Sequence, residues 1–324
     1  MRGAILQYLR NNGSAWVSGE EICQSLSISR TAVWKHINQL RQLGYEIEAQ
    51  PRSGYRLLQI PDRLYPEEIK HGLATKMVGQ NIIYLEKTVS TNIDAKELAE
   101  GSTPEGSVVV SEEQVKGRGR LGRSWYSPYG KNLLFSLILY PQVNPMETPQ
   151  FTLLTAVAVT NAIGKACNVT PAIKWPNDLL LEGKKVCGIL VELSAEINKV
   201  NYIVIGQGIN VNMDAKDFPE EVEDTATSLK GELGRPVDRV ELLRTIFREF
   251  EDRYYLWQVE GFKPILDEYK KNCFNLGRSA RIISGSEHWE GTVEDIGHDG
   301  ALLLRLGNGE LKRFIAGEVK LRGR

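Results

Sequence analysis

The chain has 324 residues, of which 42% are hydrophobic and 25% charged, and its formal net charge is -1. These values are typical of a globular protein of two or three domains and exclude a disordered or fibrous chain. The balanced charge gives no overall attraction to nucleic acid or membranes, so any contact with DNA must be local. The four Cys residues are far apart, which argues against a disulfide framework or a Cys-rich zinc site.

The sequence shows no segment that would carry the chain into a membrane. No apolar run approaches the roughly 18 residues of a membrane helix, and the first residues lack the apolar core of a signal peptide. We therefore expect a cytoplasmic protein that makes no membrane contact.

Residues 1–60 predict three short helices followed by a hairpin. Apolar residues recur at helical spacing in the first two helices, and Ser18 is a candidate cap for the second. After a break at residues 27–29, a third helix would bury Val33, Ile37 and Leu40 and end at Gly44. Two strand-like runs flank the turn at residues 51–54, which favours a hairpin with a basic tip.

This order of elements resembles a winged helix-turn-helix, in which the third helix enters the major groove and the hairpin forms the wing. The segment carries seven Lys and Arg side chains against four Glu, so it is locally basic. A small helical domain with a merely solvated polar face remains the alternative. The residues predicted to contact DNA are Arg30, Thr31, Trp34, Lys35, Asn38 and Arg52.

A connector punctuated by Pro61 and Pro66 precedes a larger region that mixes helices and strands. Its strand-like runs are residues 82–85, 107–110, 133–139, 186–191 and 202–205. Its helical segments are residues 92–100, 150–167, 239–258 and 261–271. From residue 278 onward, short strands and the turns Asp299-Gly300 and Asn308-Gly309 predict a small β-barrel or sandwich. We expect domains at residues 1–60, 61–275 and 276–324.

The segment Gly117-Arg118-Gly119-Arg120-Leu121-Gly122-Arg123 matches two phosphate-binding patterns in part. A dinucleotide fingerprint or a P-loop must open a helix, but here a strand-like run follows, so both are excluded. What remains is a loop of three Arg and three Gly that can close over a polyanion, because glycine amides approach closely and guanidinium groups neutralise phosphate. An arginine-rich loop for nucleic acid or a solvated tip are the alternatives.

Several further motifs accompany this loop, in a fixed order along the chain. Together they resemble the biotin protein ligases, and with the winged helix the resemblance points to the bifunctional members that also repress transcription. It covers roughly residues 60–324, and nearly the whole chain when the N-terminal segment is included. The motifs are Ser90-Thr91-Asn92, Gln114, Gly117 to Arg123 with Trp125, Lys174-Trp175-Pro176-Asn177-Asp178, Lys185 to Leu190, and Gly206-Gln207-Gly208-Ile209-Asn210.

The resemblance implies an α+β multidomain fold: a winged helix-turn-helix, a mixed-sheet catalytic domain similar to class II aminoacyl-tRNA synthetases, and an SH3-like C-terminal β-barrel. It implies that biotin and ATP form biotinyl-5'-AMP and that biotin is passed to a lysine of a carrier such as the biotin carboxyl carrier protein of acetyl-CoA carboxylase. The adenylate would also act as corepressor for a homodimer bound to operator DNA. Mg²⁺ is expected, with no assigned ligands.

The same resemblance implies roles for individual residues. Lys185 would face the carboxylate and the phosphate, while Arg118 and Arg120 would close over the adenylate. The residues expected to bind biotin or its adenylate are Ser90, Thr91, Asn92, Gln114, Gly117, Arg118, Gly119, Arg120 and Lys185. Those expected near the nucleotide or metal are Arg123, Trp125, Asn177, Asp178 and Asn210, although a turn-forming role suits Asn177 and Asp178 equally. A ligase for a related acyl acid such as lipoate and a ligand-sensing repressor without ligase activity remain alternatives.

Overall fold

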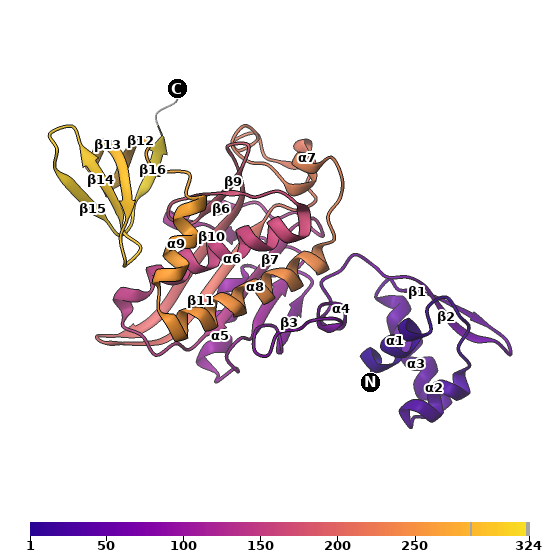
Figure 1. Cartoon of the computed structure of the whole chain (residues 1–324). Coiled ribbons are helices and arrows are strands. Elements are labelled where there is room, and N and C mark those ends of the chain that lie inside the picture. Colours follow the sequence, from indigo (N-terminus) through magenta and orange to yellow (C-terminus); the bar gives the residue numbers. More distant parts are fainter. Residues whose placement is uncertain (286, 322–324) are drawn as a thin grey trace. The chain divides into compact units, whose positions relative to one another are not determined.

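The computed structural model of the chain describes residues 1–285 and 287–321. It divides into two compact units, Met1–Arg63 and Leu64–Arg324, which are shown in Figure 1 and are treated separately below. Among the described residues, no helix combines the length and hydropathy needed to cross a bilayer.

The first unit contains α1 (Arg2–Asn11), α2 (Gly19–Leu26) and α3 (Arg30–Gln42), followed by the antiparallel pair β1 (Glu46–Gln50) and β2 (Gly54–Gln59). This is the predicted order of a winged helix-turn-helix. Ser18 caps α2 as predicted: its side chain accepts from Glu21 N, and the Glu21 side chain accepts from Ser18 N. Helix α3 ends at Gln42, before Gly44, which has a positive φ of 90°.

The wing is fastened to the segment that precedes α2. Val17 N donates to Tyr55 O at 2.9 Å and Tyr55 N donates to Val17 O at 2.8 Å. Gly54 adopts a φ of 103°, and a Cβ at this position would overlap the carbonyl oxygen of Val17. Only glycine fits both the backbone conformation and the close approach.

The second unit is built on one seven-stranded mixed sheet. Its strand order is β3-β4-β7-β11-β10-β9-β8, in which β3 and β4 are parallel and every other neighbouring pair is antiparallel. The strands are β3 (Ile82–Leu85), β4 (Val108–Ser111), β7 (Leu133–Leu139), β8 (Ala172–Lys174), β9 (Asp178–Leu181), β10 (Lys184–Glu196) and β11 (Lys199–Ile209). The mixed-sheet prediction is therefore confirmed.

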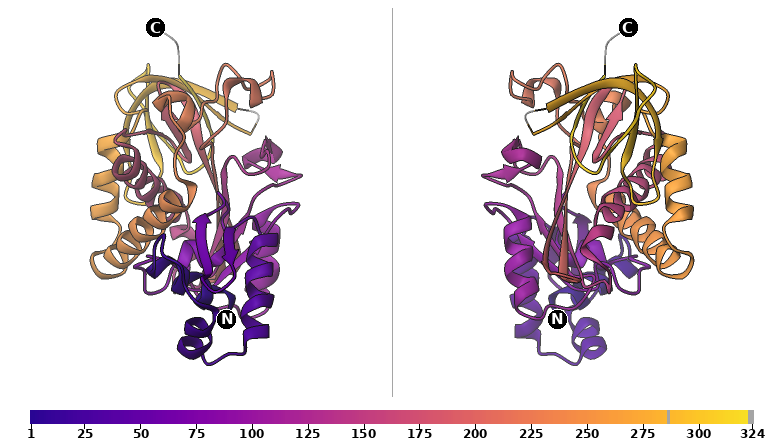
Figure 2. Two further views of the ribbon diagram at one scale, coloured as in Figure 1. Left: turned by 90° about the vertical axis from the view of Figure 1, so that its right-hand side faces the viewer. Right: turned by 90° about the vertical axis from the view of Figure 1, so that its left-hand side faces the viewer.

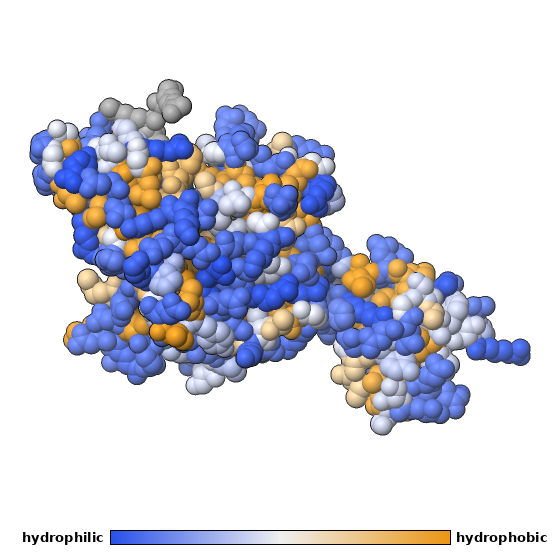
Figure 3. Space-filling model, viewed as in Figure 1, coloured by the Kyte–Doolittle hydropathy of each residue, from blue (hydrophilic) through white to orange (hydrophobic). Residues whose placement is uncertain are grey.

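Helices cover both faces of this sheet, as Figure 2 shows. α6 (Pro149–Cys167), α8 (Arg239–Glu260) and α9 (Lys263–Asn272) pack on one face with the main hydrophobic core. α5 (Thr91–Glu100) packs on the other face through a smaller cluster. Two helices that the sequence did not predict, α4 (Pro66–Lys70) and α7 (Leu229–Leu233), are only five residues each. The face of this unit seen in Figure 3 is mostly hydrophilic, because most apolar side chains are buried between the sheet and the helices.

The last part of the second unit is a five-stranded antiparallel sheet of order β15-β14-β13-β12-β16. Its turns place Gly300 and Gly309 at φ values of 83° and 88°, as the two predicted hairpin signals require. The indole Nε1 of Trp175 donates to Gly300 O at 2.9 Å, which ties this sheet to the β8–β9 turn. The strands are β12 (Ser279–Ser284), β13 (Glu287–Ile296), β14 (Leu302–Leu306), β15 (Leu311–Phe314) and β16 (Glu318–Leu321). The predicted third domain extends to residue 324, and its last three residues lie outside the described ones.

A fully buried ion pair lies behind the end of β4. Arg239 Nη1 is 2.8 Å from Glu112 Oε2, and both side chains have 0% exposure. The other carboxylate oxygen of Glu112 accepts from Leu64 N at 2.8 Å. The sequence pattern around Glu112 indicates a polar strand end, but this side chain is an interior structural element. Leu64, within the predicted connector, is buried as well.

Candidate active site

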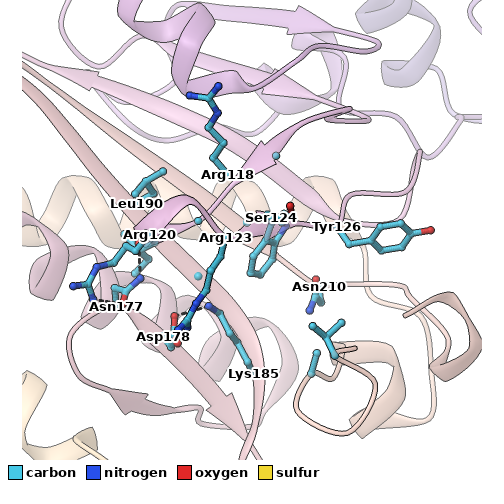
Figure 4. A pocket seen from close by; sticks show the side chains of 18 of the residues that line it. Arg118, Arg120, Arg123, Ser124, Tyr126, Asn177, Asp178, Lys185, Leu190 and Asn210 are labelled. Carbon is cyan, nitrogen blue, oxygen red and sulfur yellow. Dashed lines mark hydrogen bonds and ion pairs between the residues drawn. The ribbon is translucent and has the colours of Figure 1, made fainter. Parts of the chain in front are cut away.

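A cavity of about 1580 Å³ opens where the ends of β4, β10 and β11 meet the glycine-arginine loop. Its lining brings together all fourteen side chains or glycines that the sequence predicted near biotin, adenylate or nucleotide, several of which are labelled in Figure 4. They are Ser90, Thr91, Asn92, Gln114, Gly117, Arg118, Gly119, Arg120, Arg123, Trp125, Asn177, Asp178, Lys185 and Asn210.

A hydrogen-bonded group of short polar side chains forms one wall of the cavity. Thr91 N donates to Gln114 Oε1 at 2.8 Å. Ser136 Oγ lies 2.7 Å from Thr91 Oγ1 and 2.6 Å from Asn92 Oδ1. Ser90 is the N-cap of α5, but its hydroxyl makes no cap bond. Thr91 and Asn92 are therefore fixed in place before any ligand arrives, and Ser136, which is buried behind this wall, is a partner that sequence patterns did not reveal.

Asn92 is held from the other side by Glu192. Asn92 Nδ2 donates to Glu192 Oε2 at 2.7 Å and to Leu190 O at 3.3 Å. Lys96 Nζ donates to Glu192 Oε1 at 2.8 Å. Partial burial alone would raise the pKa of Glu192, but the hydrogen bonds from Lys96 and Asn92 outweigh it and lower that pKa below the usual glutamate value. Glu192 thus stays ionised and orients Asn92.

Three glycines form the floor of the cavity. A Cβ on Gly206 would overlap Asn92 Oδ1, and one on Gly208 would lie 2.5 Å from Trp125 Cε2. A Cβ on Gly188 would lie 3.0 Å from the same indole. The glycines of β10 and β11 therefore let Trp125 and Asn92 lie directly on the sheet, and the Gly-x-Gly spacing in β11 has a steric reason.

Lys185 projects from the start of β10 into the cavity. Its Nζ is 2.7 Å from Asp178 Oδ1 and 5.4 Å from the centroid of the Trp125 ring. The backbone of Lys185 donates to Thr225 O at 2.8 Å and accepts from Thr227 N at 2.9 Å. An ammonium group fixed between a carboxylate and an aromatic face can act as a point charge toward an anionic ligand.

The glycine-arginine loop is a short hairpin in this structure. β5 (Gly117–Arg118) pairs with β6 (Ser124–Trp125), and Arg120–Gly122 form a single 3-10 turn between them. The pattern predicted a flexible loop followed by a strand at residues 133–139. That strand is β7, whereas the pairing of β5 with β6 inside the loop was not predicted.

Two arginines of the hairpin contact the C-terminal sheet as well as the cavity wall. Arg120 Nη1 donates to Asn177 Oδ1 at 3.0 Å and its Nη2 to Gly317 O at 3.4 Å. Arg123 Nη2 is 2.5 Å from Glu318 Oε2. Burial lowers the pKa of Arg120, and the charge of Asp178 opposes this shift. In Figure 4 the side chains of Arg120 and Arg123 converge on Asn177 and Asp178, whereas Arg118 points away from them.

Comparisons with known proteins find relatives that match almost the entire chain and carry the same domains. Residues 84–210 match the Biotin/lipoate A/B protein ligase family, residues 2–56 an HTH domain, and residues 276–322 the Biotin protein ligase C terminal domain. The chain is 41% identical over 321 residues to the bifunctional ligase/repressor BirA of Bacillus subtilis, covering 99% of this chain and 98% of that protein. The chain belongs to the bifunctional biotin protein ligase/repressor family.

More distant members and solved structures extend this result. The BirA protein of Escherichia coli is 32% identical over 309 residues, covering 94% of this chain and 92% of that protein. The structure of the biotin protein ligase from Aquifex aeolicus in complex with biotin and ATP aligns with a TM-score of 0.65 and 31% identity. It covers 75% of this chain and 99% of that one.

In this member of the family, the segment after β11 supplies a further wall that the sequence analysis missed. Phe218, Pro219 and Val222 line the cavity. The segment is held by ion pairs, with Lys131 Nζ 2.5 Å from Asp217 Oδ2. Nothing in its acidic, turn-rich sequence distinguishes it from an ordinary surface loop, so only the fold reveals its place.

The structure also narrows the role of Asn177. Its Nδ2 donates to Ile189 O at 2.8 Å, and Ile189 N donates to Asn177 O at 3.0 Å. These bonds orient Oδ1 toward Arg120, so the side-chain amide of Asn177 accepts a hydrogen bond from this arginine of the hairpin. Contact of Asn177 with a nucleotide remains a prediction.

The residues predicted to contact DNA lie in the first unit. Thr31, Trp34 and Lys35 are exposed on α3, and Asn38 is partly buried there. Arg30 lies at the start of α3, where its Nη2 is 3.0 Å from Glu20 Oε2. Arg52 lies in the turn of the wing with a φ of 70°. Their roles remain predictions.

Proposed function

We propose that this protein joins biotin to ATP as biotinyl-5'-AMP, passes biotin to a lysine of the biotin carboxyl carrier protein, and represses biotin genes as an adenylate-bound homodimer on operator DNA. The observation that carries the proposal is the assembly of Lys185, the hairpin arginines and the polar wall around one cavity. As part of the proposal, residues 1–60 bind DNA, residues 61–275 catalyse, residues 276–324 complete the site, and both activities take place in the cytoplasm.

In the first step, a carboxylate oxygen of biotin bonds to the α-phosphorus of ATP and pyrophosphate leaves. Both reactants are anions and repel each other. A fixed positive charge beside the α-phosphate lowers the activation barrier, because it stabilises the negative charge of the transition state. Lys185 is suited to this position, because Asp178 and the Trp125 ring hold its ammonium group in the cavity. The ion pair with Asp178 also keeps the ammonium group of Lys185 in the cavity, from which it can move to a phosphate oxygen when ATP binds.

In the second step, the amine of the carrier lysine attacks the carbonyl carbon of the mixed anhydride, AMP leaves, and the amine loses a proton. The mixed anhydride must be kept from water until the carrier arrives. Arg120 and Arg123 support this role, because their contacts with Asn177 and Glu318 hold the hairpin over the cavity.

Mg²⁺ is proposed to enter with ATP. Among the described residues, no group of three or more His, Cys, Asp or Glu side chains could hold a metal ion. The residues of the cavity fit the usual magnesium mode, in which phosphates and one or two carboxylates bind the ion, and Asp178 would be the carboxylate here. The ion would neutralise phosphate charge.

Biotin-dependent exchange of labelled pyrophosphate into ATP, together with labelling of a biotin carrier domain, tests the ligase. We expect Lys185→Ala to reduce exchange by about 100- to 1,000-fold, as loss of one preorganised charge does. Lys184→Ala is the matched control, because Lys184 is the exposed neighbour on β10, and we expect it to retain exchange. A folded protein that neither exchanges nor labels would refute the ligase and favour a ligand-sensing repressor. Exchange with lipoate instead of biotin would reassign the substrate.

Deletion of residues 1–63 tests the repressor. The first unit ends at Arg63, so we expect the remaining chain to catalyse exchange but to lose operator binding. Unchanged DNA affinity after the deletion would contradict the assignment. Sedimentation of the full chain with biotin and ATP tests the proposed dimer.

A further inference from the structure

Helix α3 has two stripes of different chemistry. Its buried residues are Val33, Ile37 and Leu40, spaced by four and three residues. The second stripe follows the same helical spacing of three and four residues, so its members lie on one side of the helix, away from the core. It consists of Thr31, Trp34, Lys35 and Asn38.

Trp34 is the unusual member of this second stripe. Its side chain is 60% exposed, although tryptophan is among the largest apolar side chains. The other tryptophan of this unit, Trp16, has the guanidinium of Arg56 4.7 Å from its ring centroid. An exposed indole among polar side chains leaves a large apolar area in water, and burying this area against an apolar partner would lower the free energy.

Two arginines near the stripe, Arg41 and Arg56, are engaged in the fold. Arg41 donates two hydrogen bonds to Ile47 O, at 2.9 and 2.7 Å. Arg56 is 2.6 Å from Glu48 in addition to its position over Trp16. Arg41 and Arg56 are thus occupied, whereas Arg30, four residues before Trp34, forms an exposed ion pair with Glu20. The outward stripe itself presents an indole ring, a hydroxyl, an ammonium group and an amide.

We infer that Trp34 reads the 5-methyl group of thymine in the operator. The major groove presents only one apolar group on its base edges, and it is this methyl group. A helix that enters the groove with Trp34 at the centre of its outward stripe places the ring where the methyl group of a thymine can cover it. The inference rests on the operator binding proposed above and adds the base that this residue selects.

Uracil interference tests the inference. The full-length protein with biotin and ATP first selects duplexes from a random pool, and thymines of a selected duplex are then replaced singly by uracil, which lacks only the methyl group. We expect binding of the unchanged protein to weaken about tenfold at one or two thymines in each half-site, as loss of one base contact does. Trp34→Ala should bind more weakly and be insensitive to uracil at those positions, whereas Trp34→Phe should remain sensitive.

Leu58→Ala is the matched control, because Leu58 is an apolar side chain of the same unit with 55% exposure. It should keep the uracil pattern, and circular dichroism checks that each variant is folded. A protein indifferent to uracil everywhere, or a Trp34→Ala variant with the unchanged pattern, would overturn the inference. If Trp34→Ala altered only self-association, Trp34 would be a protein contact and the inference would be wrong. Failure to select any duplex would instead refute operator binding itself.

Discussion

Replacing Gly206 by alanine places a methyl group where Asn92 Oδ1 now lies. Asn92 must then move away from Ser136 at 2.6 Å, from Glu192 at 2.7 Å and from Leu190 O at 3.3 Å. A neutral hydrogen bond contributes about 1 kcal/mol to stability and one to a charged group about 2 kcal/mol. We expect the free energy of unfolding of the second unit to fall by about 3 to 4 kcal/mol.

Urea titration measures this fall, and calorimetric titration with biotin measures the accompanying loss of affinity, which we expect to exceed tenfold. Gly307→Ala is the control, because a Cβ on Gly307 would have no atom within 4 Å. If Asn92 is the group displaced, adding Gly206→Ala to Asn92→Ala should cost much less than it does alone. Full additivity of the two changes, or an unaltered Gly206→Ala protein, would refute the reasoning.

Three further changes give distinct results. Gly54→Ala should abolish DNA binding but leave pyrophosphate exchange unchanged, and parallel gel-shift and exchange assays measure the two; equal loss of both would contradict it. Arg239→Met leaves the buried Glu112 carboxylate without its cation, so we expect about 3 to 5 kcal/mol of destabilisation in urea, and a loss below 1 kcal/mol would be the contrary result. The pKa of Glu192 is lowered in the folded state, so its contribution is present above the ordinary glutamate pKa and is lost as pH falls toward the folded value. Urea titrations from pH 7 to pH 3 should therefore show a steeper decline for the unchanged protein than for Glu192→Gln, and parallel curves would exclude this role.

Local patterns predicted much of the fold because the relevant forces are local. Ser18 caps the second helix through residues three positions away, and Gly300 and Gly309 take the positive φ that their turns demand. The apolar runs of β3 and β7 coincide with the observed strands Ile82–Leu85 and Leu133–Leu139. The family motifs then placed the cavity residues, whose convergence no periodicity could show.

What the sequence did not predict depends on contacts between distant segments. Ser136 and Glu192 hold Asn92 from positions 44 and 100 residues away. The sequence around a glutamate at a polar strand end is the same whether its side chain is exposed to solvent or buried. The burial of Glu112 therefore could not be predicted from the sequence. Likewise, nothing in the hairpin sequence indicates that Arg123 reaches Glu318.

The hydrogen bond from Leu64 N to the buried Glu112 carboxylate has a mechanical consequence. Leu64 is the first residue of the second unit, so tension transmitted along the connector meets a charge-assisted bond anchored by Arg239 before it can reach Gln114, two residues beyond Glu112. In a single-molecule pulling experiment on the N-terminus, we expect the first unit to extend while the cavity of the second unit still retains biotin.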